Sequence, residues 1–247
     1  MWDSYYWRHV ATLTRILHQS PKLRETAAYQ AAYEELLAFS EAHIWDRYEA
    51  DGLHNFYRSR THMASHWARI GMELFTITGK AKYKAVFDNI SFGTMVNRPS
   101  NLREQLFMHD TVTTAYQWDM EWGVPQGAAL QDTSHGGAVV SFWVLANDLG
   151  MYWTADDIEA VQSTLVNLVW PPSEGSDFFD LVDGTGEEQP GRLHEWLTLG
   201  RYDATLQARI KSDYVDDNSA FFGTHVLGIA AYNAKILAHG APAYPEP

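Results

Sequence analysis

The chain has 247 residues, of which 46% are hydrophobic and 14% aromatic, a length and composition that suit one large domain or two small ones. Its 18 Lys and Arg against 31 Asp and Glu give a formal net charge of −13, and no basic run of five residues occurs, so nucleic acid is not an expected partner. The absence of cysteine excludes disulfides, thiolate metal sites and a cysteine nucleophile.

A membrane location is not expected from the sequence. No window approaches eighteen uninterrupted apolar residues, and the acidic balance disfavours binding to an anionic membrane. Residues 1–4 lack the basic and apolar regions with which a signal peptide begins. We therefore expect a secreted or periplasmic protein if such a peptide was removed, and a cytoplasmic one otherwise. The oligomeric state is left open.

Helical spacing of apolar residues runs through the first half of the chain. The first helix is expected over about residues 5–18, and Pro21 begins the second. A further helix is expected over residues 61–78, where Gly79 is a good C-terminal cap. A short helix over about residues 80–90 should pack back on it.

The second half is also expected to be helical, over about residues 102–122, 135–149, 155–170, 193–210 and 218–239. Thr154 to Asp157 form a capping-box pattern, and residues 171–191 form a long acidic loop of a kind that often carries function. No run shows convincing strand alternation. These patterns predict an all-α fold of stacked helical hairpins in a single domain over residues 1–247.

The most informative motif surrounds His135, at the start of an apolar helix. A polar loop over residues 132–134 leads into the helix, and Gly136 and Gly137 remove side chains beside the imidazole, so that another chain or a ligand could approach the backbone. A ring that titrates near neutrality at a helix start suits proton transfer. A capping turn whose histidine satisfies a loop carbonyl fits the same pattern.

A polar stripe follows one face of the helix expected over residues 61–78. His62, His66, Arg69 and Glu73 lie at positions i, i+4, i+7 and i+11. Two histidines at i and i+4 can chelate a metal, but the Glu that follows the first His in metalloprotease helices is replaced by Met63. The stripe can equally face a substrate or solvent.

Two further segments carry candidate binding residues. His54, Asn55, Arg58 and Arg60 combine imidazole, amide and guanidinium groups that suit carboxylate binding, although a loop with salt bridges has the same composition. His109 lies among apolar residues, where a buried histidine bonded to a neighbour is the alternative to a ligand contact.

Tyr202 stands between Arg201 and Asp203, and an adjacent cation stabilises a phenolate for proton transfer. A structural anchor beside an ion pair is equally compatible. The sequence has no Gly-rich phosphate loop, no nucleophile elbow and no dinucleotide fingerprint, so no cofactor is expected.

Taken together, these residues resemble the helical-toroid polysaccharide lyases of the alginate lyase superfamily. The resembling segments are residues 132–137, residues 200–203 with Leu206 and Gln207, and the stretch that contains Asn55. The resemblance implies an (α/α) toroid, complete or incomplete. It also implies an enzyme that cleaves an anionic uronic-acid polysaccharide, alginate or glucuronan first, by β-elimination.

The resemblance also implies roles for single residues. His135 and Tyr202 would be the base and the acid, in an order left open, and Asn55 and Arg192 are candidates to neutralise the substrate carboxylate. Candidate substrate-binding residues are Arg58, Arg60, His66, His109 and Arg192. No metal is implied.

Two alternatives remain at this stage. A glycoside hydrolase on the same scaffold would need two carboxylates across a cleft, for which Asp132, Asp183 and Asp203 are candidates. A non-catalytic carbohydrate-binding domain would use the aromatic residues for stacking on sugars.

Overall fold

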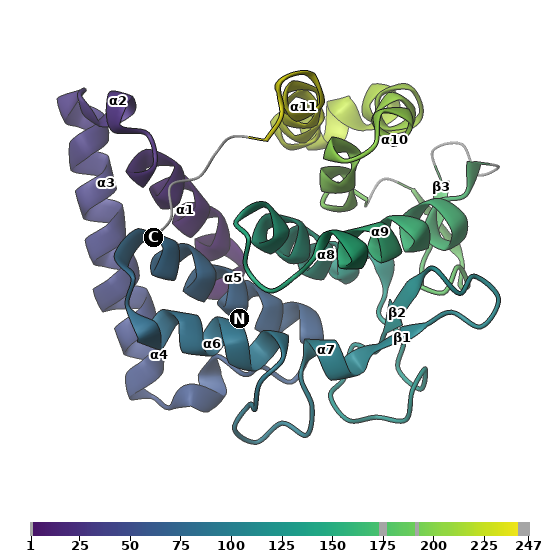
Figure 1. The fold of residues 1–247 in the computed structure, drawn as a ribbon, viewed down its shortest axis with the longest axis horizontal. Helices are drawn as coiled ribbons and strands as arrows, with labels where there is room; N and C mark the ends of the chain where they lie inside the picture. Colours follow the sequence, from purple (N-terminus) through teal and green to yellow (C-terminus); the bar gives the residue numbers. More distant parts are fainter. Residues whose placement is uncertain (1, 173–176, 191–192, 242–247) are drawn as a thin grey trace. The chain divides into compact units, whose positions relative to one another are not determined.

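A computed structural model describes residues 2–172, 177–190 and 193–241, and these are mostly helical (Figure 1), as expected for an all-α class. The described residues divide into two compact units. Unit 1 comprises residues 2–105 and 121–123, and unit 2 comprises residues 106–120 together with the described residues of 124–241. The sequence had led us to expect one domain over residues 1–247.

Unit 1 is built from helices and short helical turns. Its elements are α1 (Trp2–His18), α2 (Pro21–Arg24), α3 (Ala27–Phe39), the π-helical η1 (Ser40–Trp45), α4 (Asp46–Ala50), the 3-10 turn η2 (Leu53–Asn55), α5 (Thr61–Thr78), α6 (Ala81–Ser91) and α7 (Leu102–Gln105). Helix α5 packs against both α1 and α6. The predicted bounds of α5 are confirmed, and Gly79 ends it with φ of 68°, a left-handed conformation that suits glycine.

An aromatic cluster forms the core of unit 1. The ring of Trp45 stacks on Phe56 at 4.5 Å between centroids and meets Tyr83 edge-on at 4.7 Å. Trp67 on α5 joins the cluster through Phe56, at 5.0 Å. All four rings are buried, so much of the aromatic content of this unit serves packing.

Unit 2 combines helices with two short hairpins. Its elements are β1 (Leu106–Met108), β2 (Tyr116–Trp118), α8 (Thr133–Asp148), α9 (Ala155–Thr164), the π-helical η3 (Leu165–Val169), β3 (Asp177–Phe179), β4 (Glu188–Pro190), the 3-10 helix η5 (Trp196–Arg201), α10 (Ala204–Arg209), the π-helical η6 (Ile210–Val215) and α11 (Asp216–His239). The predicted capping box at the start of α9 is confirmed, with both reciprocal bonds between Thr154 and Asp157. None of the described helices is long and apolar enough to cross a membrane.

Two predicted helices are wrong. In place of a helix over 102–122, α7 ends at Gln105, and β1 pairs antiparallel with β2, with Phe107 opposite Gln117. Strands of three residues contain too little alternation to be recognised from sequence. In place of a helix over 193–210, the chain forms η5, turns, and begins α10 at Ala204.

A second aromatic cluster packs on the start of α8. Trp118 meets Trp143 edge-on at 5.1 Å and stacks on Trp196 at 6.0 Å. A Cβ on Gly136 would lie 3.4 Å from Trp118 and Trp196, and one on Gly137 would lie 3.0 Å from the Cβ of Glu195. The two glycines therefore admit η5 and its neighbours to the helix, rather than the ligand or second chain that the sequence suggested.

Candidate functional site

An Asp–His pair lies at the first turn of α8. Asp132 is the N-cap residue, in an extended conformation, and its Oδ1 accepts a hydrogen bond from the His135 amide at 2.9 Å. The Nδ1 atom of His135 also lies 2.9 and 3.0 Å from the two carboxylate oxygens of Asp132. Because a carboxylate only accepts, the proton of the neutral ring is on Nδ1 and the basic lone pair is on Nε2. The His135 side chain is 61% exposed.

The start of α8 is hydrogen-bonded to the acidic loop of residues 171–191, which the sequence indicates as a functional candidate. Asp132 forms an isolated antiparallel bridge with Leu181. Thr133 donates from its amide to the Asp180 carbonyl at 2.6 Å and from Oγ1 to the Phe179 carbonyl at 2.8 Å. The loop is therefore held beside the Asp–His pair by hydrogen bonds to its backbone carbonyls.

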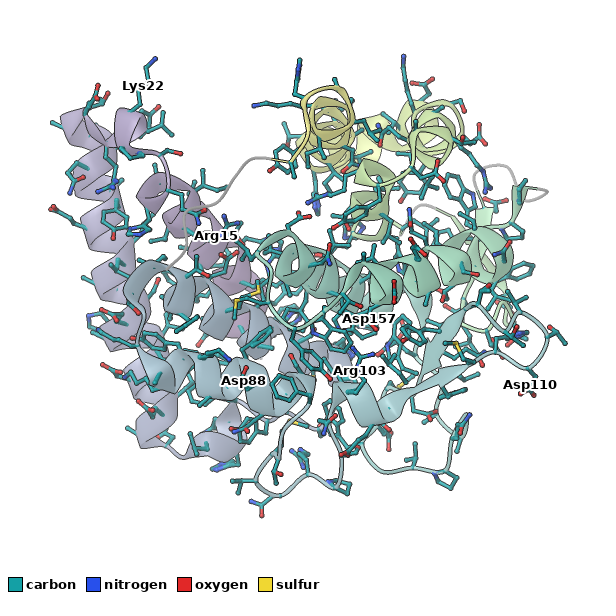
Figure 2. The ribbon with its side chains drawn as sticks, in the orientation of Figure 1. Arg15, Lys22, Asp88, Arg103, Asp110 and Asp157 are labelled. Atoms are coloured by element: carbon teal, nitrogen blue, oxygen red, sulfur yellow. The ribbon has the colours of Figure 1, made fainter. Side chains whose placement is uncertain are left out.

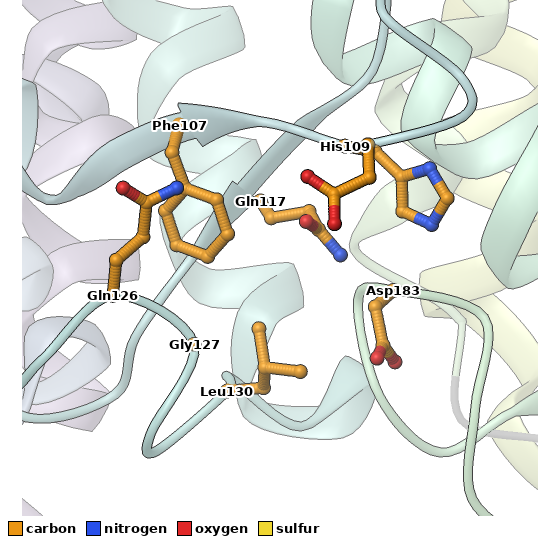
Figure 3. A pocket seen from close by; sticks show the side chains of 8 residues that line it. Phe107, His109, Gln117, Gln126, Gly127, Leu130 and Asp183 are labelled. Atoms are coloured by element: carbon orange, nitrogen blue, oxygen red, sulfur yellow. The ribbon is translucent and has the colours of Figure 1, made fainter.

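A pocket of about 270 Å³ lies in unit 2 (Figure 3). The β1–β2 hairpin, the loop that precedes α8 and the β3–β4 hairpin supply its lining. The residues that line it are Phe107, His109, Asp110, Gln117, Gln126, Gly127, Leu130 and Asp183. Most of these side chains are polar and can form hydrogen bonds with a ligand. We call it the hairpin pocket.

Local hydrogen bonds orient two titratable side chains of the hairpin pocket. Nδ1 of His109 accepts the backbone N–H groups of Thr111 at 3.2 Å and Val112 at 3.0 Å, so the neutral ring carries its proton on Nε2. Asp183 accepts from the amide of Thr185 at 3.0 Å and from its hydroxyl at 2.7 Å. Both side chains are held by residues of their own turns. The expected binding role of His109 is thus compatible with its place in the pocket lining.

Asp119 supports the pocket wall from behind. It is 1% exposed, and its two carboxylate oxygens accept the amides of Gly127 at 2.9 Å and Ala129 at 2.8 Å. The sequence reasoning missed this residue. Its partners are eight and ten residues along the chain, in an irregular loop, and no spacing rule connects them.

The Asp–His pair and the hairpin pocket share one stretch of chain. Leu130, which lines the pocket, precedes Asp132 by two residues, and both residues form antiparallel bridges, Leu130 with Asp119 and Asp132 with Leu181. Two residues of extended chain span about 7 Å, and their side chains project from the same face. The pair and the pocket wall are therefore neighbours along the chain.

Tyr202 lies at the other end of α8. Its hydroxyl donates to Asp148 Oδ1 at 2.8 Å and lies 3.4 Å from the Val144 carbonyl, and Asp148 also forms an ion pair with Arg201. Val144 follows His135 by nine residues, so the helix rise places the hydroxyl at least about 13 Å along the axis. The structure does not bring His135 and Tyr202 together, and Tyr202 has the contacts of an anchor.

Asn55, Arg58 and Arg60 belong to unit 1. The Asn55 amide donates to the Gly52 carbonyl at 3.2 Å, and Arg60 forms a half-exposed ion pair with Glu121. The carbonyl of Arg58 accepts the indole N–H of Trp122 at 2.7 Å. The two arginines thus take part in holding residues 121–123 on this unit. Arg192, the other candidate neutraliser, lies outside the described residues.

The polar stripe of α5 is buried against α1, which corrects the expectation of a face toward substrate or solvent. Glu73 is fully buried, accepts the Thr12 hydroxyl and forms an ion pair with Arg15, which Figure 2 labels on α1. His66 is 4% exposed and meets the Tyr5 ring edge-on at 5.6 Å.

Burial holds the pKa of His66 well below its usual value, and the nearby positive charge of Arg8 adds to this effect. His66 is therefore a neutral interior residue at pH 7, not the substrate contact expected from the sequence. Within the described residues, no three His, Asp or Glu side chains group closely enough to hold a metal ion.

Comparisons of the chain with protein-family models, with curated proteins and with solved structures found no match.

Proposed function

We propose that this protein is a polysaccharide lyase that cleaves a uronic-acid polymer by β-elimination, with His135 as the base. The observation that carries the proposal is the hydrogen bond from His135 Nδ1 to Asp132 at 2.9 Å, on a ring that is 61% exposed. The carboxylate sets the tautomer, directs Nε2 as the proton acceptor and stabilises the imidazolium that forms. An exposed pair of this kind is suited to take a proton from a large substrate.

Nε2 of His135 removes the proton at C5 of the uronate, and the electron pair left on carbon forms the C4–C5 double bond as the C4–O glycosidic bond breaks. The imidazolium can return its proton to the leaving oxygen when both lie on one face of the sugar, which requires no second acid. This replaces the expected His135–Tyr202 pair.

Two parts of the proposal come from the sequence resemblance alone. Asn55 or Arg192 would neutralise the uronate carboxylate, which makes the C5 proton acidic. The (α/α) toroid, complete or incomplete, would be the scaffold. Arg58 and Arg60 would contact further carboxylates of the polymer, since guanidinium groups bind carboxylates in a bidentate manner.

The test is a comparison of His135→Gln with Tyr202→Phe on a panel of uronic-acid polymers, following the near-ultraviolet absorbance of the unsaturated product. We expect His135→Gln to lower the rate by about 10²–10⁴-fold, the usual contribution of a positioned base. Tyr202→Phe is the matched control. It should keep turnover and lose about 1 kcal/mol of stability, because one hydrogen bond to Asp148 is removed.

Each outcome decides one assignment. A wild-type protein that releases no unsaturated product from any polymer would contradict the lyase proposal. A rate loss in Tyr202→Phe as large as that in His135→Gln would return Tyr202 to the mechanism. An unchanged rate in folded His135→Gln would show that His135 is not the base.

A glycoside hydrolase is the second candidate, and the acidic lining of the hairpin pocket favours it. Of the three expected carboxylates, Asp183 lines the pocket, whereas Asp203 caps α10 by accepting the amides of Thr205 and Leu206. Asp132 serves as the cap of α8, and Asp110 joins Asp183 in the pocket lining. In the same assay, new reducing ends without near-ultraviolet absorbance would support hydrolysis over elimination.

A further inference from the structure

The side-chain amide of Gln117 lies in the hairpin pocket (Figure 3). Gln117 is 6% exposed and its backbone pairs with Phe107 in the β1–β2 hairpin. No hydrogen bond from its side chain is formed with any residue that the structure describes. Figure 3 shows the amide pointing into the pocket, in the space bordered by His109 and Asp183.

An amide in this position is open to whatever occupies the pocket. Although Gln117 as a whole is 6% exposed, its amide faces the pocket (Figure 3), so water or a ligand there can reach it. The Gln117 amide offers both a donor and an acceptor to a ligand. A polar molecule in the pocket can therefore replace water on this amide.

The formal charge of the lining limits which molecule fits. Asp110 and Asp183 are both carboxylates, and the described lining includes neither Lys nor Arg. An anion would meet two like charges with no fixed cation to offset them, whereas hydroxyl groups can donate to the carboxylates. The lining favours a neutral donor-rich ligand over a uronate.

The remaining side chains fit a sugar ring. His109 presents Nε2–H as a donor, because its Nδ1 accepts two backbone amides. Phe107 offers an aromatic face and Leu130 an aliphatic one for the C–H groups of a pyranose. The volume of about 270 Å³ is at the lower limit of ligand pockets, which suits one small ring rather than an oligomer.

We infer that the hairpin pocket binds a neutral pyranose, held by Gln117, His109 and Asp183 and stacked on Phe107. This binding function is separate from β-elimination and does not require it. If the protein is also a lyase, its substrate would be a polymer that contains both uronate and neutral sugars, and the hairpin pocket would bind one of the neutral sugars. The inference is tested by binding alone, so it stands or fails independently of the lyase assay.

The experiment uses the full chain and saturation-transfer NMR with three sets of ligands: methyl glycosides of glucose, galactose, mannose and xylose; glucuronate; and glucosamine. We expect at least one neutral glycoside to bind and glucuronate not to bind. Gln117→Leu should weaken the binding by about ten-fold or more, since a buried hydrogen bond to the ligand is lost. The matched control is Gln162→Leu in the same unit, where the side chain donates to the Leu199 carbonyl outside the pocket. It should leave the affinity unchanged.

A second variant tests whether the carboxylates of the lining exclude an anionic ligand, and it leaves Gln117 in place. Asp183→Asn keeps the shape of the side chain and removes one carboxylate, so binding of glucuronate should appear or increase at least several-fold relative to the neutral glycoside. Binding of no neutral glycoside, binding of glucuronate or glucosamine alone, or equal loss in Gln117→Leu and Gln162→Leu would each overturn the inference.

Discussion

His66 and His135 are both histidines on long helices, yet their surroundings give them opposite chemistry. His66 lies 4% exposed between α5 and α1, where burial and the neighbouring cations keep the ring neutral. His135 lies at the first turn of α8 with Nδ1 bonded to Asp132 and most of its ring in solvent. A proton is costly on the first ring and can be exchanged on the second. Of these two histidines, the exposed His135 is the one for which we propose acid–base chemistry.

The lowered pKa of His66 predicts a pH-dependent stability. In the unfolded chain the ring titrates near 6.5, and in the folded protein it titrates well below that value. Above pH 6.5 the ring is neutral in both states and does not oppose folding. As the pH falls from 6.5 toward the folded pKa, the unfolded chain binds a proton that the folded protein does not, and the stability of the fold decreases. We expect the free energy of unfolding to fall as the pH is lowered below 6.5, by at most about 1 kcal/mol per pH unit from this one group.

The measurement is urea unfolding of the wild type and His66→Phe over pH 5 to 7.5. The variant keeps a ring against Tyr5 and has no titrating nitrogen, so its stability should vary less over that range. Equal slopes in the two proteins would show that other groups cause the dependence.

At the scale of the element, the loop before α8 is held by a side chain as well as by backbone pairing. Asp119 receives the amides of Gly127 and Ala129, and these bonds place Gly127 and Leu130 in the wall of the hairpin pocket. Hydrogen bonds to a charged group stabilise by about 1.5–3 kcal/mol each. The pocket therefore depends on a residue that does not line it.

Asp119→Asn removes the charge and leaves one oxygen to accept two amides. We expect hydrogen exchange at Gly127 and Ala129 to become at least about tenfold faster, because each lost charged bond exceeds about 1.4 kcal/mol. Asp203→Asn is the control, since Asp203 caps α10 and should affect Thr205 and Leu206 instead. Unchanged exchange at Gly127 and Ala129 would contradict the role of Asp119.

At the scale of the whole molecule, each compact unit has its own core. Unit 1 is organised around Trp45, and unit 2 around Trp118, Trp143 and Trp196. The buried ion pair of Glu73 with Arg15 belongs to unit 1 alone. Its loss leaves an arginine charge buried, which typically costs about 3–5 kcal/mol.

Glu73→Gln should therefore destabilise unit 1 more than unit 2. Amides of α5 and α6 should lose protection from hydrogen exchange, while those of α8 keep theirs. Glu121→Gln breaks the half-exposed pair with Arg60 in the same unit and should cost only about 0–1 kcal/mol. An equal loss of protection in α5 and α8 would show that the two cores unfold as one.

Local patterns explain which features could be predicted from the sequence. Residues 61–78 form the expected helix, Gly79 ends it, and Thr154 begins α9 with the expected capping box. Asp132 caps α8 as a capping turn requires, although the His135 ring bonds to the Asp132 carboxylate and not to the loop carbonyl that the motif had suggested. Each of these depends on residues no more than a few positions apart, where helix geometry determines the contacts.

The sequence by itself determined the mostly helical class, the caps and the polar start of α8, because these follow from neighbouring residues. Only the tertiary structure decided which polar residues are buried and which meet. It placed His66 and Glu73 against α1, separated Tyr202 from His135 along α8, and used Asp119 to build a pocket wall. These contacts join side chains far apart in sequence or in different elements, and the periodicity of one helix does not specify what packs on its polar face.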